Sequence, residues 1–397
     1  MRLIFRYIIL LFTIISSLSA YAEVLLKERN IDAGEVYSLN SSVLGEERDI
    51  FISLPESYYR SNHKYPIIYV LDAEFLFDIT RASVAIRAAR NYMPESIIVG
   101  VPNNTGKRLD MAMEIFNDKG DPFFHGENIG QTAKYLRFFE KELFPNIEMS
   151  FRVNNHRTII GLSPTFGPVL EAFWSKSDLF SGYIVLAAEI GKKLKSGKTI
   201  AEKLVEEIAN KQRPSASIYV GTSSGDIAKR GDKEATLYLE LPKWLEQNAN
   251  PNIRYKFEII PNEDHYGMTI PGIQSGLDTI SPREVWLVDY RKFWQSENPA
   301  KALQDAYLKL SKLYGFKVIP LEKGFYSIHN ISKAADIMER QKRIKELVSW
   351  LELAVEYYPK SSALHARLSK AYAQADKPDL SAKAAKIAKS LAKAFVR

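Results

Sequence analysis

Short, wholly apolar runs alternate with segments of helical spacing over the first two thirds of the chain, and this alternation restricts the fold more than any other feature. A continuous apolar run is typical of a strand that is buried on both faces. Strands that alternate with helices predict an α/β fold with a mostly parallel, two-sided sheet. The predicted buried strands lie at residues 64–72, 96–101, 182–186, 217–221 and 254–260, after two further strands within 35–54.

One strand–helix connection has a serine at its turn. Ile159 and Ile160 lead into Gly161, Ser163 follows two residues later, and the segment after Pro164 has apolar residues at helical spacing. A strand, a tight turn with serine at its tip and a helix are the parts of a nucleophile elbow, which raises the serine Oγ above the sheet. We therefore predict that Ser163 is a nucleophile. The alternative is an ordinary strand–turn–helix connection.

The turn departs from the usual Gly-x-Ser-x-Gly pattern at two positions. Thr165 occupies the place of the second glycine. Pro164 follows the serine, although the residue there normally donates its N–H to the oxyanion hole and proline has none. Proline does suit the first position of a helix. We expect Leu162 and Pro164 to border the oxyanion or substrate site, and the remaining donors to come from the backbone of Ala73 and Glu74.

A nucleophilic serine needs a base, and the base needs an acid that orients it. His265 follows the last predicted strand, where parallel strand ends would bring it near the serine; the alternative is a loop histidine without a role. Asp226 follows the preceding strand, and the order serine, aspartate, histidine is that of α/β-hydrolases. A surface aspartate is an equally good interpretation of Asp226, and its rivals for the role of acid are Asp232, Glu234 and Asp264.

Residues 1–22 have the parts of a secretory signal peptide. Arg2 and Arg6 form a basic start, an apolar stretch follows, and an Ala-Tyr-Ala cleavage site ends at Ala22. The apolar stretch is shorter than the roughly 20 residues that span a bilayer. We therefore expect cleavage after Ala22, export to a bacterial periplasm and no stable membrane anchor thereafter.

Composition narrows the chemistry further. The 397 residues include no cysteine, which excludes disulfides, thiol nucleophiles and thiolate metal sites. The formal net charge of +7 is mild for this length, and no basic stripe is interleaved with aromatic residues, so nucleic acid is not an expected partner. Nothing in the sequence implies a metal or a cofactor.

Helical patterns replace strands beyond about residue 298. Three apolar stripes lie within 347–358, 364–375 and 380–391, and the turn before the second resembles that of a tetratricopeptide repeat. One complete repeat is too little to fold alone, so we expect these helices to pack on the first domain or on residues 302–313. The sequence thus predicts a signal peptide at 1–22, an α/β-hydrolase domain at 23–285, and an α-helical, tetratricopeptide-like region at 295–397, which is a candidate surface for a protein partner.

Several short motifs in the same order resemble an esterase family of the α/β-hydrolase superfamily, which includes esterase D, siderophore esterases, feruloyl esterases and mycolyltransferases. The resemblance covers about residues 36–277, and the helical tail resembles an extension seen on some exported members. It implies that Ser163 is the nucleophile, that His265 is the base and that the substrate is an ester. The matching segments are 65–72 (YPIIYVLD), 98–103 (IVGVPN) with Arg108 and Asp110, 138–145 (FFEKELFP), 157–163 (RTIIGLS), 178–180 (DLF) and 263–265 (EDH).

The chain also departs from that family at several positions. Leu162 stands where the family usually has histidine, Ala73 where it usually has glycine, and residues 187–189 (AAE) replace Ser-Pro-Ser. These differences bear on the turnover rate and on the substrate class, and not on the fold.

The sequence as a whole predicts an exported serine hydrolase that acts on a small-molecule ester. Ser163 would attack the carbonyl, His265 would take the proton, and Asp226 would hold the imidazole ring. A competing hypothesis is a catalytically degenerate hydrolase fold that binds a protein through its helical tail; the residues at positions 164 and 165 motivate it. Transfer of the acyl group to an alcohol is a third hypothesis.

Overall fold

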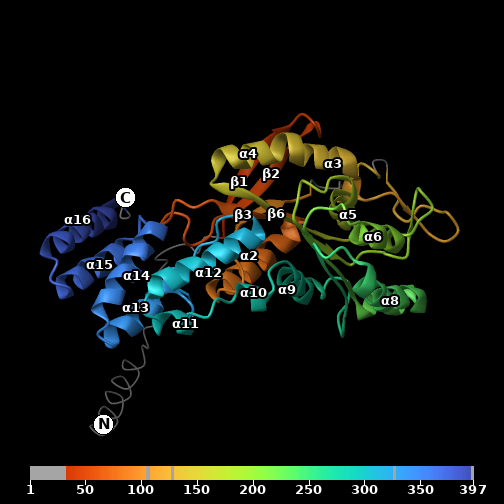
Figure 1. Cartoon of the computed structure of the whole chain (residues 1–397). Helices are drawn as coiled ribbons and strands as arrows, with labels where there is room; N and C mark the ends of the chain where they lie inside the picture. The colour runs from red at the N-terminus through yellow and green to blue at the C-terminus, as the bar shows by residue number, and fades with distance from the viewer. Residues whose placement is uncertain (1–32, 104–107, 127–128, 325–327, 395–397) are drawn as a thin grey trace, which may run out of the picture. The chain divides into compact units, whose positions relative to one another are not determined.

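A mixed sheet of eight strands forms the centre of the computed structural model, which describes residues 33–103, 108–126, 129–324 and 328–394 (Figure 1). The two strands at one edge pair antiparallel and the first of the remaining six joins them antiparallel, whereas those six run parallel to one another. The predicted signal peptide at 1–22 lies outside the described residues. In spatial order the strands are β1 (Glu35–Ser41), β2 (Glu46–Ser53), β4 (Ile97–Val101), β3 (Tyr65–Leu71), β6 (Val153–Leu162), β7 (Gly182–Leu186), β9 (Ala216–Ser223) and β10 (Ile253–Ile260).

Both faces of the central strands are covered. In β3, the side chains of Ile67, Tyr69 and Leu71 belong to one apolar cluster, whereas those of Ile68 and Val70 belong to another. All five residues are at most 3% exposed. The continuous apolar run in the sequence is therefore a strand buried on both faces, as a parallel sheet between helices requires.

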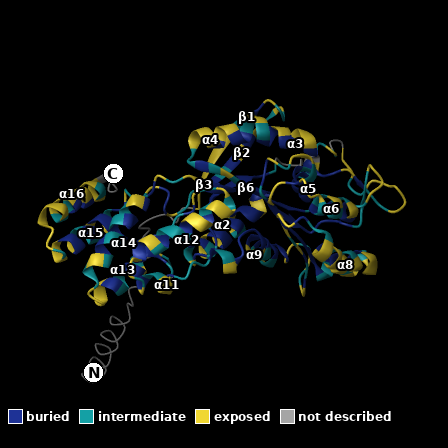
Figure 2. Cartoon of the chain, in the orientation of Figure 1, coloured by how far each residue is buried: buried dark blue, intermediate teal, exposed yellow. Residues whose placement is uncertain are grey.

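Helices form a layer on each side of this sheet, and Figure 2 shows that their exposed residues lie on the outward sides. This arrangement confirms the predicted α/β class with a mostly parallel sheet. On one face lie α2 (Ala73–Ala89) and α9 (Thr269–Ile280), and on the other α3 (Thr132–Phe138), α4 (Phe144–Ser150), α5 (Phe166–Ser175), α6 (Ile200–Ala209) and α8 (Asp232–Asn248). The short helix α7 (Ser224–Arg230) connects β9 to α8.

Two local features of the fold are not evident from the sequence. Helix α8 continues through Pro242, although proline usually kinks or interrupts a helix; Tyr238 and Leu245, one turn to either side, are buried in the core and hold both halves in place. The polar segment after β4 contains β5 (Ile115–Phe116), which pairs antiparallel with β8 (Lys193–Leu194). Pairing between segments so far apart in sequence leaves no local pattern that predicts it.

A separate apolar cluster holds the C-terminal helices together. It includes Trp286 and Tyr290, which precede the predicted start of the helical region, as well as Tyr307 and Trp350. No helix among the described residues has both the length and the apolar character needed to cross a bilayer. The helices of this region are α10 (Arg283–Trp286), α11 (Arg291–Trp294), α12 (Pro299–Tyr314), α13 (Ile331–Arg340), α14 (Ile344–Tyr357), α15 (Ser362–Gln374) and α16 (Pro378–Ala394). Their tetratricopeptide-like nature stays a prediction.

Polar contacts join this C-terminal region to the segment before β3 and to the segment after α2. Arg60 Nε donates to Glu322 Oε2 at 2.7 Å. The buried amide of Asn91 donates to the hydroxyl of Tyr307 at 3.2 Å, and this hydroxyl lies 3.0 Å from that of Tyr290. Buried polar groups that satisfy one another in this way fix one arrangement of the two surfaces.

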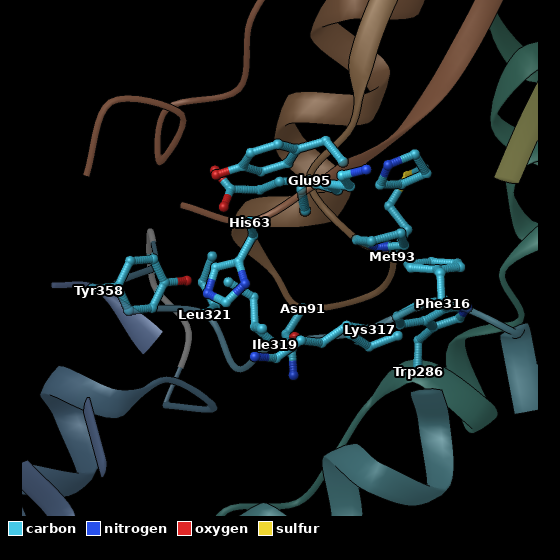
Figure 3. Close-up of a pocket in the computed structure, with 16 residues that line it drawn as sticks. His63, Asn91, Met93, Glu95, Trp286, Phe316, Lys317, Ile319, Leu321 and Tyr358 are labelled. Carbon is cyan, nitrogen blue, oxygen red and sulfur yellow. The ribbon is translucent and has the colours of Figure 1, made fainter. Parts of the chain in front are cut away.

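A small pocket of about 40 Å³ lies between the same two surfaces, and Figure 3 shows side chains from both of them around it. His63 Nε2 lies 2.7 Å from the carbonyl oxygen of Tyr357, and burial lowers the pKa of this histidine. Burial likewise raises the pKa of Glu95, whose carboxylate accepts the N–H of Ser57 at 3.1 Å. Both shifts favour the neutral forms of these two side chains, beside the Arg60–Glu322 ion pair that also joins the two surfaces.

We expect the helical region to be needed for folding of the whole chain. Deletion of residues 299–397 removes the partners of Trp286 and Tyr290 and should yield aggregated protein by size-exclusion chromatography. Deletion of 376–397, which removes only α16, is the control and should leave a monomer with a cooperative thermal transition. A monomeric, cooperatively folding chain that ends at residue 298 would contradict this expectation.

Candidate active site

Polar and charged residues gather where the parallel strands end. Asp72 follows β3, Ser163 follows β6, and Glu189 comes three residues after β7. Asp226 lies in α7, directly after β9, and His265 follows β10. The carboxyl ends of parallel strands meet at one edge of a sheet, and ligands bind there in open α/β folds.

His265 and Asp226 are in direct contact. His265 Nδ1 lies 3.0 Å from Asp226 Oδ1 and 2.9 Å from Oδ2, and Asp226 is 5% exposed. The backbone N–H of Asp226 donates to Ser223 Oγ, the N-cap of α7, which fixes the start of that helix. Burial alone would raise the pKa of Asp226, but the hydrogen bond with His265 and the charge of Arg230 outweigh it and lower the pKa below its usual value.

Two of the three rival acids bind backbone N–H groups, and the third is exposed. Asp264 Oδ1 accepts the N–H groups of two following residues, Tyr266 at 3.0 Å and Gly267 at 2.6 Å. Glu234 Oε2 accepts a backbone N–H from the loop after β7 at 2.9 Å. Asp232 is exposed at the start of α8. Among the described residues, Asp226 is the carboxylate that the fold brings against His265.

Ser163 lies at the tip of a sharp turn between β6 and α5. A Cβ at Gly161 would lie 2.4 Å from the carbonyl oxygen of Thr165, so the close approach of strand and helix requires glycine at this position. The N–H of Ser163 donates to Leu186 O at 3.2 Å. In the described part of the chain no hydrogen bond joins Ser163 Oγ to His265; such bonds commonly tighten only in the complex with substrate.

Thr165, the departure from the glycine pattern, has a defined place in this turn. Its hydroxyl lies 2.6 Å from Asp72 Oδ2 and 2.7 Å from the carbonyl of Leu162, and it accepts the N–H of Leu162 at 3.0 Å. Thr165 and Asp72 are both fully buried. The threonine therefore joins the serine turn to the end of β3, a contact that glycine could not make.

Asp72 also holds a guanidinium beside the serine. Arg108 donates to Asp72 through Nε at 2.8 Å and Nη2 at 3.2 Å, and Nη2 also donates to the backbone carbonyl of Ser163 at 2.7 Å. Burial acts to lower the pKa of Arg108, but the hydrogen bond and charge of Asp72 outweigh it and raise the pKa further. Asn103 Nδ2 completes the set with a 2.6 Å bond to Asp72 Oδ1.

The four residues expected at the oxyanion or substrate site differ in what they can donate. Pro164 has no N–H, and the N–H of Leu162 is taken by the hydroxyl of Thr165. Ala73 and Glu74 are the first two residues of α2, and the first N–H groups of a helix have no acceptor within the helix. Two of the four can therefore act as donors, at a helix end whose dipole favours negative charge.

Sequence reasoning did not identify the roles of Asp72, Arg108 and Arg230. Asp72 and Arg108 appeared only as parts of matching motifs. Their importance follows from contacts between segments far apart in the chain: Asp72 and Thr165 are separated by 93 positions. The signal that the sequence offered for this contact was a family motif with Asp72 after one predicted strand and Arg108 after the next.

A family model described as "Putative esterase" matches residues 41–261, which is more than half of the chain. The ferri-bacillibactin esterase BesA of Bacillus subtilis (strain 168) is 30% identical over 170 residues, 39% of this chain and 57% of that protein. The chain thus aligns with little more than half the length of this curated relative.

Solved structures share the fold. An IroE-like serine hydrolase from Shewanella oneidensis has a TM-score of 0.64 at 22% identity, over 81% of this chain and 98% of that one. The BES protein from Bacillus cereus has a TM-score of 0.53 at 22% identity, over 65% of this chain and 99% of its own. The siderophore hydrolase EstB from Aspergillus nidulans has a TM-score of 0.51 at 19% identity, over 66% of this chain and 99% of its own.

The contacts of Thr165 predict a stability effect. Thr165→Val keeps the side-chain shape but removes the hydroxyl from buried Asp72, so we expect a loss of about 1–3 kcal/mol in the free energy of unfolding, measured by urea denaturation. Thr165→Ser keeps a hydroxyl and should cost less. Equal stabilities for the valine variant and the wild type would show that this hydroxyl does not hold the turn to β3.

Proposed function

Because the chain belongs to this esterase family, we propose that it hydrolyses carboxylic esters with Ser163 as nucleophile, His265 as base and Asp226 as orienting acid. The observation on which the proposal rests is the pair of short contacts, 2.9 and 3.0 Å, between His265 and buried Asp226. Activation of a serine needs a histidine that a buried carboxylate holds in place near that serine. Here the histidine, the carboxylate and the serine turn all lie at the same edge of the sheet.

The reaction would proceed in two halves. Ser163 Oγ attacks the ester carbonyl and passes its proton to His265 Nε2, while Asp226 accepts the Nδ1–H and stabilises the imidazolium. The N–H groups of Ala73 and Glu74 stabilise the oxyanion. The imidazolium then protonates the departing alcohol, which leaves an acyl-enzyme. Water, deprotonated by the same histidine, releases the acid and restores the serine.

Arg108 and Asp72 support the position of the serine in this scheme. The guanidinium donates to the carbonyl oxygen of Ser163 and is itself fixed by a buried carboxylate. Both groups act on the backbone of the turn and touch no reacting atom, so we assign them a positioning role.

Siderophore esters are the substrate class that we propose. The relative from Bacillus subtilis is a ferri-bacillibactin esterase. Two large aromatic side chains next to the site, Phe75 and Tyr266, are 57% and 60% exposed. The ring of Tyr266 lies 5.0 Å from that of His265, and the guanidinium of Arg108 lies 5.7 Å from the ring of Phe75. Exposed aromatic rings beside a cation suit an extended aromatic acyl group.

We further propose that the protein works in the periplasm. The basic start, apolar stretch and Ala-Tyr-Ala site within residues 1–22 support export, and the absence of cysteine suits an oxidising compartment.

Ester hydrolysis by the mature chain tests this function. We expect Ser163→Ala to abolish turnover of an aryl ester while the thermal transition stays unchanged. Asp226→Asn should lower kcat by about 10⁴-fold, because the imidazole loses the acceptor that sets its tautomer.

Asp264→Asn is the matched control, since Asp264 adjoins His265 in sequence but binds backbone N–H groups that an amide oxygen can also accept. It should keep most of the activity. Full activity of the Asp226→Asn variant, or turnover that survives in Ser163→Ala, would contradict the assignment.

A further inference from the structure

A second charged cluster lies behind the contact between Asp226 and His265. Arg230, the last residue of α7, reaches three acidic side chains. Its guanidinium nitrogens lie 2.8 Å from Glu189 Oε1, 3.6 Å from Asp226 Oδ2 and 3.8 Å from Glu234 Oε1. The four side chains are only 7–11% exposed. Buried charges need compensation, and here one cation serves three carboxylates that come from different elements.

Two backbone carbonyls and one side-chain hydroxyl fix the plane of this guanidinium. Arg230 Nη1 donates to the carbonyl of Ala188 at 2.9 Å and to Thr222 Oγ1 at 3.1 Å, and Nη2 donates to the carbonyl of Ala187 at 3.3 Å. These acceptors belong to the ends of β7 and β9, so Arg230 ties both strand ends to α7. The planar arginine fork can make all these bonds at once, whereas a lysine could not.

Glu189 is the closest partner of this cation. Burial raises the pKa of Glu189, and the charge of Arg230 opposes that rise. Burial also raises the pKa of Glu234. At longer range, Lys192 and His265 also lower the pKa of Glu189, whereas Asp226 raises it. The strongest compensation of Glu189 is therefore the 2.8 Å pair with Arg230, and Asp226 shares what remains of that charge.

We infer that Arg230 is a positioning residue for Asp226, and that Glu189, by sharing the charge of Arg230, sets how readily His265 takes up a proton. This inference rests on the proposed function of the site, because it concerns the base of that reaction. It assigns a role to Glu189, which stands at a position where the esterase family usually has serine.

The two members of the pair act with opposite signs. A positive charge near Asp226 disfavours the imidazolium form of His265, so removal of the Arg230 charge should let the imidazole bind its proton at higher pH. Removal of the Glu189 charge leaves Arg230 less compensated, so protonation should require lower pH. One unit charge several ångströms away in a partly buried site shifts such a titration by about 0.5–1 pH unit.

NMR titration of the histidine ring signals in the mature full chain tests this inference without any need for turnover. The signal of His265 is assigned by comparison with a His265→Gln variant. We expect Glu189→Gln to move the titration midpoint down by about 0.5 pH unit or more, and Arg230→Gln to move it up by a similar amount. The double variant replaces two opposite charges, whose sum is zero, with two uncharged side chains. Its titration midpoint should therefore return close to that of the wild type.

Two controls separate charge from shape. Lys229→Gln removes an exposed charge next to Arg230 and should leave the midpoint within about 0.2 pH unit of wild type, since exposed charges are screened. Arg230→Lys keeps the charge and should keep the midpoint, while the rate of ester hydrolysis falls because the fork that holds both strand ends is lost.

The outcomes distinguish this inference from the proposed function. Shifts of the same sign in Glu189→Gln and Arg230→Gln, or no shift in Glu189→Gln, would overturn the inference even if the wild type hydrolyses esters. Opposite shifts of the titration midpoint in these two variants would support the inference at any rate of ester hydrolysis. Should Arg230→Gln fail to fold, the nearly isosteric Glu189→Gln variant and Arg230→Lys still decide the question.

Discussion

The buried carboxylate of Asp72 is the group on which the serine side of the site depends. It lies at the end of β3 with a positive φ of 49° and is fully buried. An isolated buried charge would be very costly, so its environment must supply donors. Thr165 and Arg108 meet this need from the serine turn and from the segment after β4, and Arg108 also holds the carbonyl of Ser163. One carboxylate thus joins three segments around Ser163.

The histidine side of the site depends on a comparable arrangement with the charges reversed. There the buried cation Arg230 joins the ends of β7 and β9 to α7, and Asp226 is one of its partners. Each half of the site is therefore built around one buried charge that several strand ends must satisfy. This makes the strand ends rigid, which is what precise positioning of a nucleophile and a base requires.

Much of this arrangement could be predicted from the sequence. The continuous apolar runs predicted the parallel sheet. Ser163 and His265 follow predicted strands, and they were candidates for the site because parallel strands bring their ends together. The sequence favoured Asp226 as the acid only through its place after a predicted strand, because the contact itself depends on which loop turns toward the histidine. The role of Thr165 could not be predicted either, because its hydrogen bond to Asp72, 93 positions away, leaves no local pattern in the sequence.

The central claim, that Ser163 is an activated nucleophile, is tested most directly by covalent labelling. The mature protein is treated with a fluorophosphonate, and the modified peptide is identified by mass spectrometry. The account predicts one adduct, on Ser163, that disappears in Ser163→Ala and forms much more slowly in Asp226→Asn. A folded wild-type protein that stays unlabelled, or an adduct on another residue, would contradict it.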